Sequence, residues 1–257
     1  MTSRHPVVFI GHGNPMNALA DNAFTRALRA LGESLPRPKA VLCVSAHWMT
    51  EGFALTDDAF PDTIHDFTGF PPELHEVRYE PAGDPALAAD ARDLLAPAPV
   101  VLSEEWGLDH GAWSVLRHIY PAADVPVVQL SIDPARPASE HYALGRALRP
   151  LRERGVLILG SGNIVHNLRR MQWRGEPAPE PWATEFDSFV AARVEAHDDA
   201  ALLGEPDTMP GGALSVPTPD HWLPFVVSLG AAKGGTVSFP YATIDHAAIS
   251  MRCVRWD

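Results

Sequence analysis

The chain has 257 residues, of which 46% are hydrophobic and 20% are charged, and its formal net charge is -12. This length and composition suit a globular protein with ample material for a core. The acidic balance argues against a nucleic-acid partner, because nothing supplies the basic stripe that phosphate backbones require. The first apolar run is too short for a signal peptide, and no run is long enough to span a membrane. We therefore expect a cytoplasmic protein without a membrane partner.

Short apolar runs alternate with helical periodicity along the chain, without internal repeats or low-complexity linkers. In the first half, the pattern predicts a strand at Val7–Ile10, a helix from the N-cap Asp21 to about Leu31, strands at Ala40–Ala46 and Phe53–Thr56, a helix at Asp84–Leu95, a strand at Val100–Leu102 and a helix from the N-cap Asp109 to Tyr120. In the second half, it predicts a strand at Val125–Ile132, a helix at Pro137–Arg152, a strand at Gly155–Gly160, helices at Pro181–Ala196 and Thr218–Leu229, and two last strands at 236–239 and 248–256.

Near-continuous apolar strands separated by helices are typical of a mostly parallel sheet covered on both faces. We therefore predict a single α/β domain over residues 1–257, with a mostly parallel central sheet flanked by helices. The last two strands have no helix between them and should join an edge of the sheet in antiparallel fashion. The long irregular segment Pro61–Pro81 should form a lid or a wall of the site. Cys43 and Cys253 lie in apolar runs and read as small buried residues rather than as a disulfide framework.

Three of the 12 histidines follow fully apolar strands in the same manner. "VVFIGHG" contains His12, "VLCVSAHW" contains His47, and "VLILGSGNIVHN" contains His166. In open α/β sheets, the groups just beyond the carboxyl ends of the strands line the ligand crevice. A single histidine in this position is more often structural. The same pattern of an apolar strand followed by a histidine occurs three times, however, and this predicts a shared site at the strand ends.

A fourth candidate is His221 in "SVPTPDHWLPF". Thr218 suits an N-cap and Pro219 the first helical position, so His221 would lie in the first turn. A helix N-terminus disfavours imidazolium, and neutral imidazole is the form that binds divalent metals. The alternative is an ordinary surface histidine. Several neutral histidines with open space around them indicate a catalytic metal, and such ligands suit zinc and ferrous iron almost equally.

The remaining histidines carry weaker signals. His110 follows Asp109 at a helix start, where its imidazole either enters the same crevice or belongs only to a capping turn. His65 and His75 lie in the irregular segment, and the sequence suggests solvated or incidental positions for His5, His141, His197 and His246. Phe67, Phe70 and Tyr79 of the irregular segment are available to contact a flat ring, and His65 is placed with Phe67 and Phe70 as a candidate substrate-binding residue.

Eight motifs, in order along nearly the whole chain, carry a resemblance to a known family: "GHGNPMNAL", "SAHW", "TIHDFTGFP", "GLDHGAW", "PVVQLSID", "SGNIVHNLR", "PWATEF" and "PTPDHWLPF". Together they resemble the class III extradiol ring-cleavage dioxygenases, and within them the branch of 4,5-DOPA dioxygenases. The resemblance implies a non-haem iron(II) site, which can also hold zinc, with His12, His47 and His221 as ligands. It further implies that His166 is the catalytic histidine and that His110 lines the pocket with it.

The reaction implied by this resemblance opens a catechol ring beside its diol with O2 and gives a muconic semialdehyde. His166 would take a hydroxyl proton as general base. All three implied ligands are neutral, whereas the common iron(II) triad contains a carboxylate, so a bound catecholate would supply the compensating charge. Asn14 and Val216 stand where relatives often have Ser and Asn, respectively, which bears on the pocket wall and hence on the substrate.

Two alternatives stay open from the sequence. One is a zinc hydrolase in which His166 or an acid activates metal-bound water, and the other is a non-catalytic metal-binding protein. Oxygen uptake with a catechol separates the dioxygenase from both. The sequence leaves open which catechol is used, which metal is native, whether His166 also ligates the metal and whether the chain forms a homo-oligomer.

Overall fold

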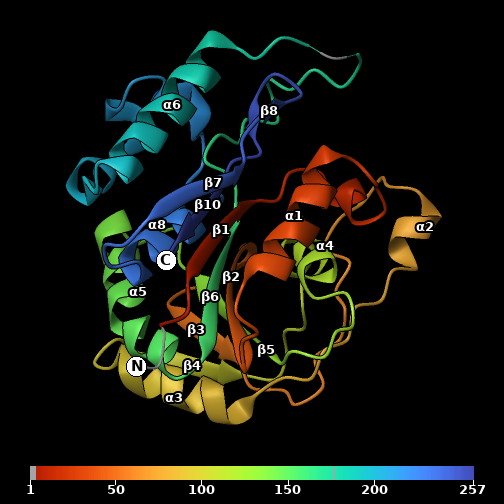
Figure 1. Ribbon diagram of the computed structural model, residues 1–257, viewed down its shortest axis with the longest axis vertical. Coiled ribbons are helices and arrows are strands. Elements are labelled where there is room, and N and C mark those ends of the chain that lie inside the picture. The colour runs from red at the N-terminus through yellow and green to blue at the C-terminus, as the bar shows by residue number, and fades with distance from the viewer. Residues whose placement is uncertain (1–3, 176) are drawn as a thin grey trace.

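The computed structural model describes residues 4–175 and 177–257, and its centre is an eight-stranded sheet with the strand order β4-β3-β5-β2-β6-β1-β10-β7 (Figure 1). The strands of this sheet are β1 (Val7–Gly11), β2 (Ala40–Met49), β3 (Phe53–Thr56), β4 (Val100–Ser103), β5 (Val127–Ile132), β6 (Val156–Gly162), β7 (Val237–Tyr241) and β10 (Cys253–Trp256). A separate small sheet pairs β8 (Ile244–Asp245) with β9 (Ile249–Ser250).

The four central strands, β5, β2, β6 and β1, are parallel to one another. At one side β10 is antiparallel to β1 and β7 to β10, which confirms the expected antiparallel addition of the C-terminal strands. At the other side β3 is antiparallel to β5 and carries β4 parallel to itself. The chain has no helix between β2 and β3, only the turn 50–52, so its direction reverses there instead of crossing over.

Helices cover both faces of the sheet (Figure 1). They are α1 (Ala23–Ser34), α2 (Pro72–His75), α3 (Pro85–Leu95), α4 (His110–Ile119), α5 (Ala138–Glu153), α6 (Pro181–Glu195), α7 (Gly212–Ser215) and α8 (Leu223–Ala231), with 3-10 turns η1 (Pro15–Ala18), η2 (Asp199–Leu202) and η3 (Pro206–Thr208). One core lies between the sheet and α1 and α4, and a second lies between the sheet and α3, α5 and α8. The predicted α/β class with a mostly parallel, helix-flanked sheet is confirmed.

Two predicted helix starts are wrong. The N-cap of α1 is Asn22, which forms a reciprocal capping box with Thr25, whereas Asp21 pairs with Arg29 at 2.9 Å. The helix predicted from Thr218 begins only at Leu223, so His221 precedes α8 instead of lying in its first turn.

Two histidines expected to be solvated or incidental are buried instead. His141 is fully buried on α5, where its Nδ1 donates to the Pro137 carbonyl and its Nε2 accepts from the Asp133 backbone N–H. His5 is also buried, and its carbonyl accepts from the Arg152 guanidinium at 2.7 Å. The contacts that bury these two residues come from distant parts of the fold or from a helix turn, and sequence periodicity does not reveal them.

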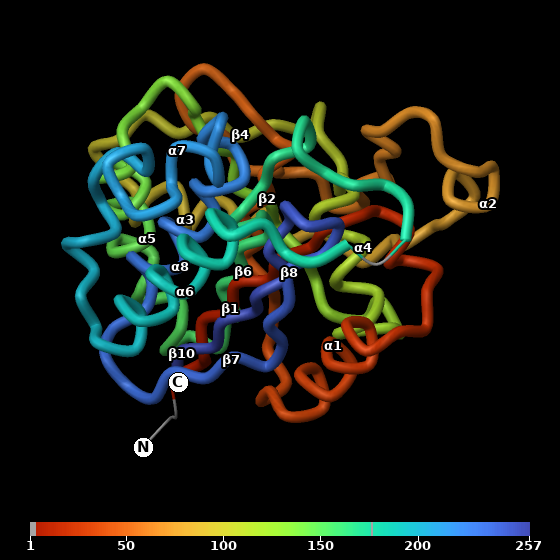
Figure 2. Tube along the Cα trace, turned by 90° about the horizontal axis from the view of Figure 1, so that it is seen from above, coloured from red at the N-terminus to blue at the C-terminus, as the bar shows by residue number. Residues whose placement is uncertain are grey.

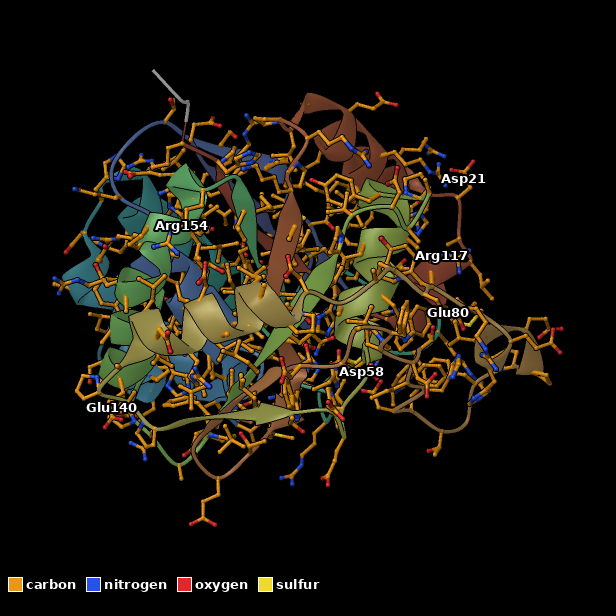
Figure 3. The ribbon with its side chains drawn as sticks, turned by 90° about the horizontal axis from the view of Figure 1, so that it is seen from below. Asp21, Asp58, Glu80, Arg117, Glu140 and Arg154 are labelled. Carbon is orange, nitrogen blue, oxygen red and sulfur yellow. The ribbon has the colours of Figure 1, made fainter. Side chains whose placement is uncertain are left out.

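Charged side chains are scattered over the surface. Figure 3, seen from below, labels six of them in well-separated parts of the molecule: Asp21, Asp58, Glu80, Arg117, Glu140 and Arg154. Several acids are neutralised locally, as in the ion pairs of Arg154 with Asp90 and of Arg136 with Glu140. Within the described residues, no helix combines the length and apolar character needed to cross a membrane.

Candidate metal centre

Five histidine side chains come together beyond the carboxyl ends of the central strands. Figure 2 views the fold from above, on the side of these strand ends. His12 directly follows β1, and His166 comes four residues after β6. His47 lies in the irregular last part of β2, between Val44 and Met49, where the pairing with β5 shifts register. His110 opens α4 and His221 precedes α8, and all five side chains line one cavity of about 280 Å³.

The hydrogen bonds of His12 fix its tautomer. The Ser161 hydroxyl donates its only proton to the Gly111 carbonyl at 2.6 Å, so its oxygen must accept from His12 Nδ1 at 2.9 Å. His12 Nε2 is therefore an unprotonated nitrogen that faces the cavity side of the ring. Residue 111 must be a glycine here. A Cβ atom at this position would lie 2.5 Å from the Ser45 hydroxyl oxygen and 2.9 Å from the His47 ring.

His47 and His221, like His12, have a polar partner at Nδ1. His47 Nδ1 lies 3.4 Å from the Asp66 carboxylate, and His221 Nδ1 is hydrogen-bonded to Asp220. Carboxylates at Nδ1 leave both Nε2 atoms free as ligands, which is the usual carboxylate–histidine–metal arrangement.

The spacing of these nitrogens fits a single ion. Each of His12, His47 and His221 offers a ring nitrogen within 4.8 Å of the others, and His12 Nε2 lies 3.3 Å from His47 Nε2. Two lone pairs that face each other at this distance repel, whereas nitrogens bound to one metal at about 2.0–2.1 Å stand about this far apart. The donor set therefore fits a divalent transition metal.

Asp66, which the sequence reading missed, joins two of the histidines. Its carboxylate accepts from the His110 backbone N–H at 2.8 Å and from His110 Nδ1 at 2.8 Å, and the same Oδ2 lies near His47 Nδ1. Burial works against ionisation of this carboxyl, but its contacts with His110 and His47 outweigh it and lower the pKa of Asp66. The irregular segment 61–81 thus supplies the anion that orients His47 and His110.

Replacing Asp66 by Asn should weaken metal binding by about 10–100-fold, the usual cost of losing a partner behind a metal-ligating histidine. An amide cannot serve as an anionic acceptor for both imidazoles. Titration of the metal-free variant with a metal buffer measures the change. Asp62→Asn is the matched control, since Asp62 lies in the same segment with an exposed side chain. Equal metal affinity for Asp66→Asn and Asp62→Asn would contradict this role.

The buried histidines are held neutral. Burial lowers the pKa of His47 to about 3 and that of His166 to about 4, with the neighbouring His110 adding to both shifts. Burial, followed by the nearby histidines, also holds the pKa of His12 and of His221 well below the ordinary value. His221 is therefore neutral as the sequence predicted, but because of burial and not of a helix N-terminus.

These shifts predict that the metal-free protein loses stability on acidification. The unfolded chain takes up protons at these histidines below about pH 6.5, while folded His47 and His166 stay neutral down to about pH 3 and 4. The free energy of unfolding should fall between about pH 6.5 and 4, by up to about 1.4 kcal/mol per pH unit for each histidine. Urea unfolding with a chelator present measures the slope. His47→Gln should reduce it by about one proton, and an unchanged slope would contradict the prediction.

Residues of the irregular segment form part of the cavity wall. Phe67 and Phe70 line it, and their ring centroids are 5.3 Å apart. His65 is not among the lining residues: its Nε2 bonds the Val77 carbonyl, and its ring packs 5.8 Å from Phe67. Tyr79 is buried away from the cavity, with its hydroxyl donating to the Tyr120 carbonyl.

Further lining residues of the cavity are not among those predicted from the sequence. They are Leu168, Met171, Trp173, Asp245, Ile249 and Met251, together with His246. The sequence predicts a solvated or incidental position for His246, and its place in the cavity wall corrects that prediction. Their positions in the sequence give only an indirect indication of a site role. Leu168, Met171 and Trp173 follow "SGNIVHN", and the others lie in or near the segment that leads to the last strand.

Comparison with known proteins gives a consistent result. Residues 6–251 match the family described as the catalytic LigB subunit of aromatic ring-opening dioxygenase. The chain is 47% identical over 262 residues to the 4,5-DOPA dioxygenase extradiol of Escherichia coli K12, covering 99% of this chain and 95% of that protein. It is 38% identical to the protein of the same name from Beta vulgaris, covering 87% and 85%. A crystal structure of an uncharacterized Escherichia coli K12 protein superposes with a TM-score of 0.87 at 42% identity, over 99% of this chain and 100% of that one.

Proposed function

The chain belongs to the LigB family of extradiol ring-cleavage dioxygenases, and on this basis we propose that it uses iron(II) to open a DOPA-like catechol with O2, giving a muconic semialdehyde. The observation that carries the proposal is the convergence of three unprotonated Nε2 atoms, from His12, His47 and His221, on one cavity. The two Escherichia coli and Beta vulgaris relatives are named for action on DOPA, which supports a catechol of that type as substrate.

His12, His47 and His221 would hold the metal. Iron(II) would supply the electron transfer between catechol and O2 that ring opening requires, whereas zinc fits the same ligands but has no redox chemistry. The carboxylates of Asp66 and Asp220 behind the ligands provide negative charge that the neutral imidazoles lack. We therefore assign iron(II) as the working metal and zinc as a competitor for the site.

We assign proton transfer to two further histidines. His166 stacks on His221 with ring centroids 3.4 Å apart, lines the cavity and is neutral at pH 7, so its imidazole can accept a catechol hydroxyl proton. His110 donates through Nδ1 to Asp66, which leaves Nε2 as an acceptor towards the cavity. We assign His166 as the principal general base and His110 as the second proton-transfer group.

The aromatic wall suits a flat substrate. Phe67 and Phe70 bound the cavity beside His110, with the Phe67 centroid 5.5 Å from the His110 ring. They would hold a catechol ring by edge or face contact and keep water from the reacting atoms. His65 packs behind Phe67 and would act on the substrate only by holding that ring in place.

The entire chain would form one catalytic domain, because histidines from residue 12 to residue 221 line the same cavity. Both cysteines are buried free thiols in strands, which supports work in a reducing compartment such as the cytoplasm.

Anaerobic reconstitution with iron(II), followed by a catechol panel in oxygenated buffer, tests the function. We expect oxygen consumption matched to a yellow ring-opened product with iron(II), and none with zinc. Zinc added before iron(II) should block the reaction by occupying the same ligands. Turnover with zinc alone, or ester or amide hydrolysis without oxygen uptake, would overturn the assignment in favour of a zinc hydrolase.

A further inference from the structure

A strained hairpin forms one end of the cavity wall. Strands β8 and β9 are joined by a turn in which the Ala248 N–H donates to the Asp245 carbonyl. Its two central residues, His246 and Ala247, have φ of 49° and 66°, which glycine or asparagine normally adopts. Non-glycine residues held in this conformation cost energy and often mark functional positions. The turn places Asp245 and His246 in the cavity wall.

A second segment, 168–173, is attached to this hairpin. The Gln172 N–H donates to the His246 carbonyl at 3.0 Å, and His246 Nδ1 lies 3.2 Å from the Gln172 carbonyl. These bonds hold Trp173 beside His246, with ring centroids 5.8 Å apart. Trp173 is 63% exposed and lines the same cavity, so a large aromatic face stands open at the rim.

The side chains of Asp245, His246 and Trp173 all favour a positively charged, hydrogen-bond-donating group. Since a carbonyl only accepts, His246 Nδ1 carries the proton and its Nε2 is left as an acceptor. The Asp245 carboxylate accepts one side-chain hydrogen bond from the described residues, from the Thr243 hydroxyl at 3.3 Å, and retains further acceptor capacity. The face of Trp173 attracts cations. No lysine or arginine is among the residues that line the cavity in the described part of the chain.

This end of the cavity lies at a suitable distance from the proton-transfer group. His166 forms a bridge with Ile249, and Ile249 pairs with Asp245 across the hairpin. The backbones of Asp245 and His166 are thus separated by two strand spacings, which is about 10 Å. That separation is comparable with the length of a catechol ring that bears a two-carbon side chain.

We propose that Asp245, His246 and Trp173 form a specificity subsite for a primary ammonium group on the catechol side chain. The substrate class is therefore a catechol with an aminoalkyl tail. A carboxylate on the same tail is tolerated when it extends past the rim into solvent, but it is not the group recognised. This inference rests on the proposed function and names the chemistry that selects among catechols.

Binding to the zinc-loaded protein under nitrogen tests the subsite without turnover. The ligands are dopamine, ethylcatechol and dihydrocaffeic acid, which have the same ring and a two-carbon chain ending in ammonium, hydrogen and carboxylate, respectively. We expect dopamine to bind most tightly and dihydrocaffeic acid least tightly. In Asp245→Asn, the preference for dopamine over ethylcatechol should fall by about ten-fold, the usual scale for a hydrogen bond to a charged group. Asp245→Lys should shift the preference towards dihydrocaffeic acid.

Asp207→Asn is the matched control, because Asp207 is an exposed carboxylate in η3, outside the cavity wall. It should leave the ratio of dopamine to ethylcatechol affinity at the wild-type value. The subsite is overturned if the wild-type protein binds dihydrocaffeic acid as tightly as dopamine, or if Asp245→Asn keeps the wild-type ratio. If the ligand ranking holds but the iron-loaded enzyme opens none of these catechols, the proposed function fails and the ammonium subsite stands.

Discussion

Alanine at His12 should remove nearly all bound metal, and the same change at His47 or His221 should have a similar effect. His12 contributes an Nε2 atom that the Ser161 contact at Nδ1 leaves unprotonated, and this atom lies 3.3 Å from His47 Nε2. Losing even a partner behind a ligand costs about 10–100-fold in metal affinity, so losing the ligand itself should cost more. Elemental analysis after iron(II) reconstitution and gel filtration gives the metal content of each variant.

His197→Ala is the control for this experiment, because His197 is exposed and lies after α6, away from the cavity. It should keep the wild-type metal content. The overall fold of each ligand variant should survive, since the change removes a neutral imidazole that lines the cavity, and at His12 or His47 it also removes one of two facing lone pairs. Full metal retention in His12→Ala, His47→Ala and His221→Ala alike would mean that the metal lies elsewhere.

The sequence was sufficient for the parts of the site that follow directly from buried strands. The apolar runs of β1 and β6 are read easily because both faces of a parallel strand are covered, and the residues just after them must lie at the carboxyl edge. His12 and His166 follow from that rule alone. His47 also follows, although β2 extends to Met49 and so includes it.

The polar partners of these histidines could not be predicted in the same way. Ser161 is 149 residues from His12 along the chain, and Asp66 is 44 residues from His110. The first contact depends on β6 lying beside β1 in the sheet, and the second on where the irregular segment 61–81 passes the start of α4, and no local periodicity encodes either. The turn of Asp245 and His246 was missed for a related reason: two non-glycine residues with positive φ contradict the usual sequence signal for a tight hairpin.

Glutamine at His166 should separate catalysis from metal binding. His166 lies in the cavity and stacks on His221, but its role in the proposed mechanism is to accept a proton rather than to hold the ion. Glutamine keeps much of the packing volume and cannot act as a base near neutral pH. The variant should retain most of its iron(II) while kcat falls by about 10²–10⁴-fold, the usual contribution of one general acid–base group. Elemental analysis and single-turnover ring opening at saturating oxygen measure the two effects separately.

The size of that defect should depend on the acidity of the substrate. A nitrocatechol ionises readily and needs little help from a base, so it should lose much less activity in His166→Gln than an alkylcatechol does, because the missing step is then supplied by water. A general weakening of the site would depress both substrates equally and would leave no such gradient. If His166→Gln loses its metal as completely as His12→Ala, His166 is primarily a ligand. If it retains iron and opens alkylcatechols at the wild-type rate, the base must be sought at His110, whose Nε2 is left free by the Asp66 contact at Nδ1, or outside the protein.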